Sequence, residues 1–95
     1  MRIYETVFIL PSNLPEEEQK KVVEGVKSFI TKNEGRILDE KIWKNRRFAY
    51  PIKKFTEGSY FILKFETENS NLSVELERFY RMNQQIIRFS TFKEG

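Results

Sequence analysis

The chain lacks both cysteine and histidine. Without cysteine it can form no disulfide framework and use no thiol chemistry, which fits a reducing compartment. Without histidine it lacks the commonest general base and a frequent metal ligand. Its glycines, Gly25, Gly35, Gly58 and Gly95, are too scattered to form a phosphate-binding loop. We therefore expect no enzymatic activity, no metal site and no cofactor.

Long hydrophobic runs are also missing. No apolar run approaches the roughly 18 residues that a membrane-spanning helix needs. The N-terminal segment meets an acidic residue at Glu5 and has no small-residue cleavage site, so it is interpreted as a strand and not as a signal peptide. These features predict a cytoplasmic protein without a membrane partner.

What the chain does contain is typical of one small folded domain. Its 95 residues are 39% hydrophobic and include nine phenylalanines. This length predicts a single domain over residues 1–95, and we expect the last two or three residues to be disordered. The net charge is only +3, so electrostatic binding would need a local basic patch.

Hydrophobic periodicity predicts six elements in the order βαββαβ. The expected elements are a strand at Arg2–Leu10, a helix between Pro15 and Asn33, an extended segment at Arg36–Ile52, a strand at Ser59–Glu66, a helix at Leu72–Met82 and a strand at Ile86–Phe92. Residues Lys53–Gly58 would form the turn between the two central strands. We find no repeat and no linker within this order.

Local patterns also predict which faces are buried and where the helices end. Tyr4 and Phe8 should face the core, because Glu5 lies on the opposite face of the same strand. The expected end signals are the caps Ser12 or Asn13 and Ser70 or Asn71, and Gly35 in a left-handed position. The expected buried stripes are Val22, Val26, Phe29 and Ile30 in the first helix, and Leu72, Leu76, Phe79 and Tyr80 in the second.

The element order favours one α+β architecture, the ferredoxin-like two-layer sandwich. Each βαβ crossover is right-handed and leaves room for one strand between the two that it joins. Four antiparallel strands in the order 4-1-3-2 would carry both helices on one face. The second strand then lies at an edge, which also suits Pro51, a residue that cannot donate to a sheet ladder.

The opposite sheet face would have no helix to cover it. The side chains expected there are Ile3, Val7, Ile9, Ile62 and Tyr60, together with Glu5, Lys64 and Arg88. Several large apolar groups on an open face suggest a protein partner. Partial cover by the long second strand and the C-terminal residues would explain them equally well.

The segment Lys41–Lys54 is the most distinctive part of the sequence. It carries six positive charges and no acidic residue, with Trp43, Phe48 and Tyr50 between them. Cations neutralise phosphates and aromatic rings stack on bases, so the segment is a candidate nucleic-acid surface. Lysine and arginine on an edge strand also prevent edge-to-edge aggregation, which is the alternative explanation.

Within that segment, neighbouring cations are expected to have different roles. Arg46 and Arg47 would point to opposite faces of a regular strand, so one can reach RNA while the other faces a protein or the helix layer. Lys53 and Lys54 lie at a turn, from which their side chains can reach phosphates. An RNA-recognition motif shares the element order, but residues 58–65 match its third-strand signature poorly.

The residues also resemble a known family. The opening Met1–Glu5, the turn Pro11–Leu14 and above all Arg46–Lys53, RRFAYPIK, are similar to the sixth protein of the bacterial small ribosomal subunit. The resemblance covers nearly the whole chain. Family members usually have Gly where this chain has Lys44 and Leu where it has Phe48, so local backbone geometry can differ there. Many members also carry a longer tail, and tail contacts are not expected here.

The resemblance implies the ferredoxin-like fold and a structural role in the small ribosomal subunit. It implies binding to the central domain of small-subunit ribosomal RNA, as a heterodimer with the eighteenth small-subunit protein. The motif and the charge pattern together give the RNA-binding or partner-binding candidates Arg2, Tyr4, Lys44, Arg46, Arg47, Tyr50, Lys53, Lys54 and Arg88. The alternative is a ferredoxin-like regulatory domain that binds a small metabolite as a homodimer.

Overall fold

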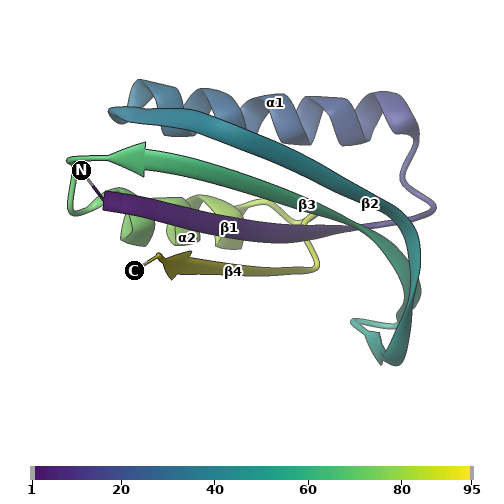
Figure 1. Ribbon diagram of the computed structural model, residues 1–95. Coiled ribbons are helices and arrows are strands. Elements are labelled where there is room, and N and C mark those ends of the chain that lie inside the picture. Colours follow the sequence, from purple (N-terminus) through teal and green to yellow (C-terminus); the bar gives the residue numbers. More distant parts are fainter. Residues whose placement is uncertain (1, 95) are drawn as a thin grey trace.

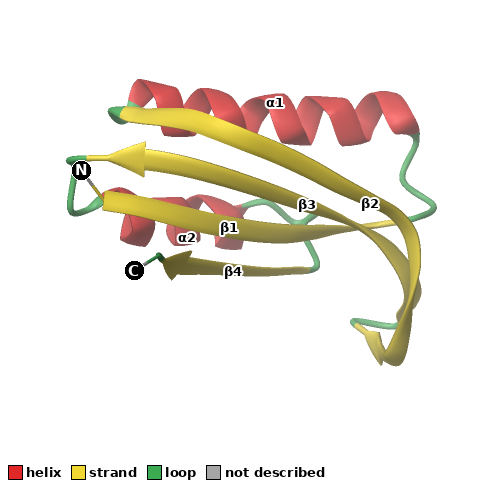
Figure 2. Ribbon diagram, viewed as in Figure 1, coloured by secondary structure: helices red, strands yellow, loops and turns green. Residues whose placement is uncertain are grey.

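The computed structural model describes residues 2–94 and has the predicted element order (Figure 1). The elements are β1 (Arg2–Pro11), α1 (Glu16–Lys32), β2 (Gly35–Ile52), β3 (Phe55–Thr67), α2 (Leu72–Met82) and β4 (Arg88–Lys93). The strands form one antiparallel sheet in the order β2-β3-β1-β4, which is the predicted order 4-1-3-2 read from the other edge. Both helices lie on one face of the sheet and β2 lies at its edge (Figure 2).

Alternating side chains of β1 build the floor of the core. Tyr4, Phe8 and Leu10 are buried on the helix side, as predicted. Tyr4 lies opposite Phe65 on β3, and Phe8 lies opposite Phe61. Both pairs stack, with ring centres 5.5 and 5.3 Å apart. Such aromatic pairs between neighbouring strands add to the stability that burial alone provides.

The helices cover this floor with the stripes that the sequence predicted. In α1 the buried residues are Val22, Val23, Val26 and Ile30, and in α2 they are Leu72, Leu76 and Tyr80. Phe29 and Phe79 are partly buried and stack on each other between the helices, with ring centres 4.6 Å apart. Burial also raises the pKa of the Tyr80 hydroxyl, although Thr6 lies within hydrogen-bond distance at 2.7 Å.

The predicted N-cap was wrong for α1 and right for α2. Pro15 occupies the N-cap of α1, and no side chain caps that helix. Asn71 occupies the N-cap of α2, as predicted, but its side chain also makes no capping bond. The left-handed residue after α1 is Glu34, with φ of 73°, and not Gly35.

Gly35 has a different reason to be glycine. A Cβ added there would collide with the Ile30 side chain and lie 2.9 Å from both the Ile30 carbonyl oxygen and Leu72 Cδ2. The start of β2 therefore packs directly against the helix layer, which only a residue without a side chain permits.

The strand ends also differ from the predicted ones. The turn between β2 and β3 is only Lys53–Lys54, so β3 begins at Phe55 and not at Ser59. Register shifts interrupt the β2–β3 ladder between Ile37 and Asp39, between Trp43 and Arg46, and between Arg47 and Ile52. β4 begins at Arg88, after the buried Ile86 and Ile87.

The C-terminal residues remain attached to the sheet through residue 94. Lys93 pairs with Tyr4, and the Glu94 amide donates a hydrogen bond of 2.8 Å to the Ile3 carbonyl oxygen. The sequence predicted disorder for the last two or three residues. Lys93 and Glu94 do not fit that expectation, and Gly95 lies outside the described residues. Neither helix within residues 2–94 is long and apolar enough to cross a membrane.

Candidate nucleic-acid and partner interface

The edge strand β2 has two parts with different surroundings. We call Gly35–Trp43 the inner half of β2, and we call Arg46–Gly58, which contains the turn to β3, the outer hairpin. Lys44 and Asn45 separate them at a β-bulge, where the register between Trp43 and Arg46 shifts. The outer hairpin continues past the end of β1 and bends toward the β4 side of the sheet (Figure 1). Bulges commonly bend a strand in this way.

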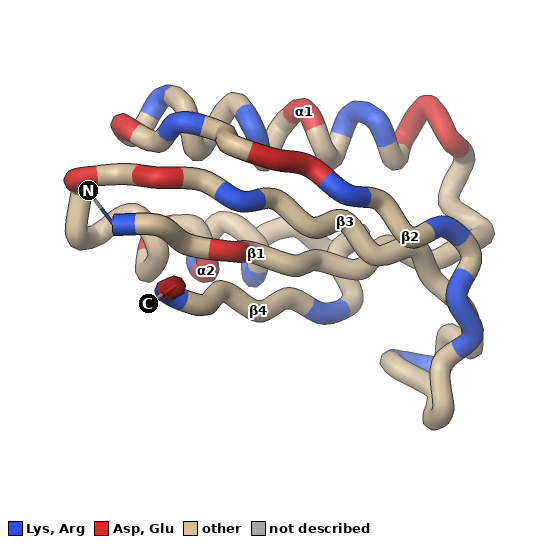
Figure 3. The backbone as a smooth tube through the Cα atoms, viewed as in Figure 1, with Lys and Arg blue, Asp and Glu red and all other residues tan. Residues whose placement is uncertain are grey.

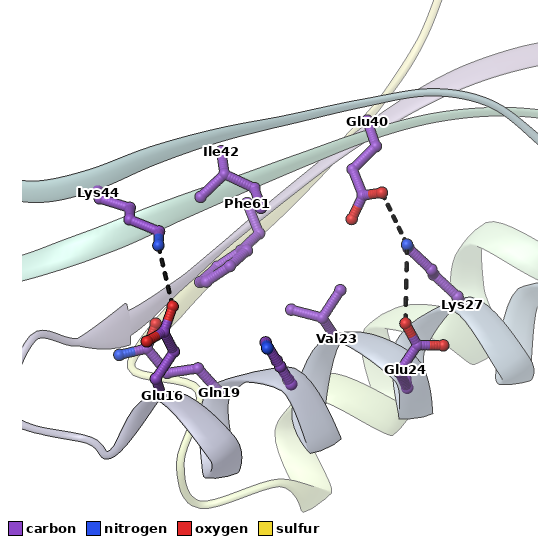
Figure 4. Close-up of a pocket in the computed structure, with 10 residues that line it drawn as sticks. Glu16, Gln19, Val23, Glu24, Lys27, Glu40, Ile42, Lys44 and Phe61 are labelled. Atoms are coloured by element: carbon purple, nitrogen blue, oxygen red, sulfur yellow. Dashed lines mark hydrogen bonds and ion pairs between the residues drawn. The ribbon is translucent and has the colours of Figure 1, made fainter.

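The inner half lies beside α1, and its Arg36 and Glu40 form ion pairs, whereas Asp39 and Lys41 form none within the described residues. A hollow of about 280 Å³ lies between these elements. Figure 4 shows Val23, Ile42 and Phe61 among the residues that line it. An ion pair stands at each end of it. Lys44 Nζ lies 3.1 Å from Glu16 Oε1 at one end, and Lys27 Nζ lies 2.7 Å from Glu40 Oε1 at the other.

This geometry gives Lys44 a different role from the one that the sequence predicted. Its ammonium faces α1, where its hydrogen bond is the main cause that holds the pKa of the Glu16 carboxyl below its ordinary value. Because the charge of Lys44 is already partly satisfied within the chain, we do not place it among the cations that contact a partner.

The outer hairpin carries cations without acidic partners. Within residues 2–94, no ion pair involves Arg46, Arg47, Lys53 or Lys54. Figure 3 shows that the charged stretches of this hairpin are mainly blue, whereas the inner half of β2 carries both blue and red. Unpaired cations on a projecting hairpin can approach phosphates without first breaking internal contacts.

The tip of the outer hairpin is strained. Lys53 and Lys54 both have positive φ angles, 48° and 73°, which are the conformations of a two-residue type I′ turn. Asparagine and glycine are the usual residues in such a turn, because side chains with a Cβ disfavour positive φ. Two lysines at these positions place two ammonium groups at the tip at a cost in conformational energy.

Arg46 and Arg47 lie on opposite sides of the outer hairpin. They pair with consecutive residues of β3, Gly58 and Glu57. The guanidinium carbon of Arg46 lies 5.9 Å from the centre of the Trp43 ring, on the open face of the sheet. Arg47 therefore points away from the open face, as the alternation predicted.

The open face carries a row of side chains that crosses all four strands. Ladder pairs join Arg88 to Ile9, Ile9 to Tyr60 and Tyr60 to Trp43. Trp43 and Tyr60 are in contact, with ring centres 6.0 Å apart. Beside this row is a hollow of about 440 Å³, which Val7 also lines. The open face thus combines apolar side chains with the guanidinium groups of Arg88 and Arg46.

Part of the open face is covered by the chain itself. Ile9 is only 4% exposed, although no helix lies on that side. The ring of Phe48 reaches over Gly58 toward Ile9 and meets Tyr60 edge-on, with ring centres 6.2 Å apart. The explanation by cover from β2 is therefore confirmed for Ile9, while Trp43 and Phe92 stay about half exposed, so a protein partner on this face remains a prediction.

The remaining predicted site residues are scattered. Tyr50, in the outer hairpin, is 82% exposed and can reach a partner. Tyr4 is buried under the helices against Phe65, so its prediction as a binding residue is wrong. Arg2 lies at the opposite end of the sheet and donates a hydrogen bond of 3.3 Å to the Glu68 carbonyl oxygen.

Sequence reasoning missed the role of Phe48 as a cover for the open face. The only signal for this role was an aromatic residue between Arg47 and Ala49. Simple alternation along the strand does not give the face of Phe48, because the bulge shifts the alternation before it. Trp43 and Tyr60 were recognised as surface aromatics but were left out of the candidate site. The structure adds both of them to it through the row on the open face.

Comparison with known proteins then identifies the family. The family model described as "Ribosomal protein S6" matches residues 3–93. The chain belongs to the ribosomal protein S6 family. The small ribosomal subunit protein bS6 of Aquifex aeolicus is 44% identical over 93 residues, which are 98% of this chain and 84% of that relative. The bS6 protein of Thermotoga petrophila is 46% identical over 93 residues, 97% of this chain and 72% of the relative.

A solved S6 structure has the same fold. The crystal structure of 30S ribosomal protein S6 from Thermotoga maritima matches with a TM-score of 0.92 at 46% identity, covering 98% of this chain and 87% of that one. The predicted family and fold are thereby confirmed. This S6-family chain is a structural constituent of the small subunit of the cytoplasmic ribosome and not an enzyme. The alternative of a metabolite-binding regulatory domain loses its support.

Proposed function

We propose that this S6-family protein binds the central domain of small-subunit ribosomal RNA together with the eighteenth small-subunit protein, and that the two ligands use different surfaces. Arg47, Lys53 and Lys54 contact RNA phosphates. The open face, with Trp43 and Arg46, receives the protein partner. The observation that carries this proposal is the contrast between the outer hairpin, whose cations form no ion pair within residues 2–94, and the adjoining stretch, where Glu40 pairs with Lys27 and Lys44 pairs with Glu16.

RNA recognition by this hairpin depends on shape and charge more than on sequence. Phosphate contacts position a protein on folded RNA, and the deep major groove of an RNA helix hides its base edges. Residues 46–58 contain four cations and one acidic residue, Glu57. That is a small patch, so binding to RNA alone is weak and falls steeply with salt.

The protein partner strengthens this binding. The open face offers apolar side chains such as Val7 and Phe92, whose burial by a partner is favourable. Two basic proteins bound to each other present a larger surface to the RNA, and their binding equilibria are then coupled. RNA affinity is therefore much higher with the partner than without it. Equal affinities in the two cases would refute the proposed coupling.

The salt dependence of RNA binding tests the split between surfaces. Single replacements of Arg47, Lys53 or Lys54 by alanine should each reduce the magnitude of the slope of log K for RNA binding against log salt concentration by about 0.7 to 1. The matched control is Lys21→Ala, which removes an equal charge from α1, where Lys21 lies 3.7 Å from Glu18. The proposal fails if the control changes the slope as much as the hairpin variants.

A further inference from the structure

We infer that the bulge at Lys44–Asn45, held by the buried hydroxyl of Ser59, decides which side of the outer hairpin each cation faces. Ser59 is thus a positioning residue for the binding surface. The identity of the bound RNA and protein rests on the proposed function. The effect of the bulge on the direction of each side chain does not depend on it.

The bulge places two residues of β2 opposite one residue of β3. Trp43 pairs with Tyr60 and Arg46 pairs with Gly58, so Lys44 and Asn45 share the single position of Ser59. Asn45 has a φ of 51°, and its amide donates a hydrogen bond of 3.2 Å to Ser59 Oγ. An extra residue leaves a backbone amide without its ladder partner, and the serine hydroxyl supplies the missing acceptor.

The position of Ser59 explains why a polar side chain is buried there. Ser59 is 1% exposed and faces the helix layer, because it pairs with the buried Leu10 of β1. A buried hydroxyl without a partner would be costly. The bulge therefore satisfies Ser59 as well as Asn45, and each stabilises the other.

The extra residue resets the alternation of everything that follows. In a regular strand of the same length, Arg46 would lie on the α1 side with Lys44, and Arg47 would lie on the open face with Trp43. With the bulge, Arg46 lies over the Trp43 ring at 5.9 Å. Three neighbouring cations thus divide between the two sides: Arg46 faces the open face, whereas Lys44, which contacts Glu16, and Arg47 face away from it.

Packing beyond the bulge fits only this register. A Cβ added at Gly58 would lie 2.6 Å from Phe48 Cζ and 2.8 Å from Ile9 Cγ2. The backbone at Gly58 therefore leaves space for the Phe48 ring, which lies on the same side as Arg46. A shift by one residue would turn Phe48 away and uncover Ile9.

Trp43 gives a direct readout, because it is the only tryptophan in the chain. In the wild type, Arg46→Gln should change the Trp43 emission maximum and its acrylamide quenching, whereas Arg47→Gln should change neither. Deletion of Asn45 removes the extra residue, so Arg46 should still pair with Gly58 and Arg47 with Glu57, and the deletion variant should keep this pattern. Asn45→Gly is the control that keeps the wild-type pattern, because glycine adopts positive φ freely.

The decisive variants keep the chain length and weaken the bulge itself. Asn45→Val introduces a β-branched residue that disfavours positive φ, and Ser59→Ala removes the acceptor of the Asn45 amide. Both should reduce the effect of Arg46→Gln on Trp43 emission. If Arg46→Gln changes Trp43 emission in both variants as much as it does in the wild type, the inference is overturned.

The binding measurements separate this inference from the proposed function. In the wild-type background, Arg47→Gln should reduce the magnitude of the slope of log K for RNA binding against log salt concentration by about 1, and Arg46→Gln should leave this slope unchanged. In Asn45→Val and Ser59→Ala, which weaken the bulge, the difference between these two effects should become smaller. If the effect of Arg46→Gln on Trp43 emission falls in these variants but the difference in RNA binding does not, the bulge sets the register and the assignment of Arg47 to RNA is wrong.

Discussion

The inner half of β2 and the outer hairpin belong to one continuous edge of the sheet, yet they differ in their packing against the helices and in the pairing of their charges. The inner half packs against α1, where Glu40 pairs with Lys27, and Lys44 at the adjoining bulge pairs with Glu16. The outer hairpin projects beyond the helix layer and leaves its cations unpaired within the described residues.

This difference shows that charge content alone does not define a binding surface. Lys44 and Arg46 are two residues apart and carry the same charge, but Lys44 pairs with Glu16 of a neighbouring helix and Arg46 forms no ion pair within the described residues. What separates them is a single extra residue in the backbone. Lys53 and Lys54 extend the contrast, because they hold a strained turn that stability alone would not select.

The largest effect should come from the core beneath the inner half. Phe65 is fully buried opposite Ile37, so Phe65→Ala should lower the free energy of unfolding by about 3–5 kcal/mol. Tyr50→Ala in the outer hairpin should change it by less than about 0.5 kcal/mol, because Tyr50 is exposed. Urea denaturation measures both. A comparable loss at Tyr50 would mean that the outer hairpin is part of the cooperative core.

A smaller loss is expected where the inner half meets the helices. Gly35→Ala should lower the free energy of unfolding by about 1–3 kcal/mol, because the added Cβ has no space beside Ile30 and Leu72. The matched control is Gly25→Ala in α1, whose Cβ would meet only Phe79 Cζ, at 4.0 Å. This control should gain about 0.5–1 kcal/mol from helix propensity. Thermal or urea unfolding of the two variants should therefore differ in sign.

The turn at the tip should behave in the opposite way from the core. Replacing Lys53 by Asn and Lys54 by Gly should raise the free energy of unfolding by about 1–2 kcal/mol, since it relieves two left-handed lysines. The same variant should bind RNA more weakly, because two cations are lost. Arginine at both positions is the control that keeps the charges and the strain. Loss of stability in the Asn-Gly variant would contradict the strained turn.

The smallest effect concerns the ion pair between Lys44 and Glu16. The hydrogen bond and charge of Lys44 lower the pKa of Glu16 from its ordinary value of 4.5. The pair therefore stabilises the fold above pH 4.5, and this contribution is lost as the pH falls through the lowered folded value. Both groups are exposed to solvent, so the contribution is small.

The variant Lys44→Met isolates this ion pair. Titration of the Glu16 carboxyl by NMR should show its pKa rising toward 4.5. Lys41→Met is the control, because Lys41 lies on the open face opposite Ile62. An equal rise in the two variants would mean that Lys44 does not face α1.

Much of the fold could be predicted from local patterns. The bounds of α2, Leu72–Met82, were predicted correctly because its apolar stripe and its preceding polar residues are unambiguous. The buried face of β1 followed from the position of Glu5. The strand order followed from the handedness of crossovers, which leaves few arrangements for βαββαβ.

The candidate site was less predictable, for physical reasons. Neither the bulge at Asn45 nor the turn at Lys53–Lys54 has the glycine that usually marks such backbone, so their positive φ angles left no signal. Tyr4 was chosen because it belongs to the motif of the family, and a motif does not separate core residues from surface residues. The partner of Lys44, Glu16, is 28 residues away along the chain.

Lysine acetylation of the assembled complex tests the central contrast most directly. The protein would be acetylated alone and when bound to small-subunit ribosomal RNA with its protein partner, and each lysine would be quantified by mass spectrometry. We predict strong protection of Lys53 and Lys54 and little change at Lys20 and Lys21 of α1. Equal protection of the two groups, or protection of the α1 lysines alone, would contradict the assignment of RNA binding to the outer hairpin.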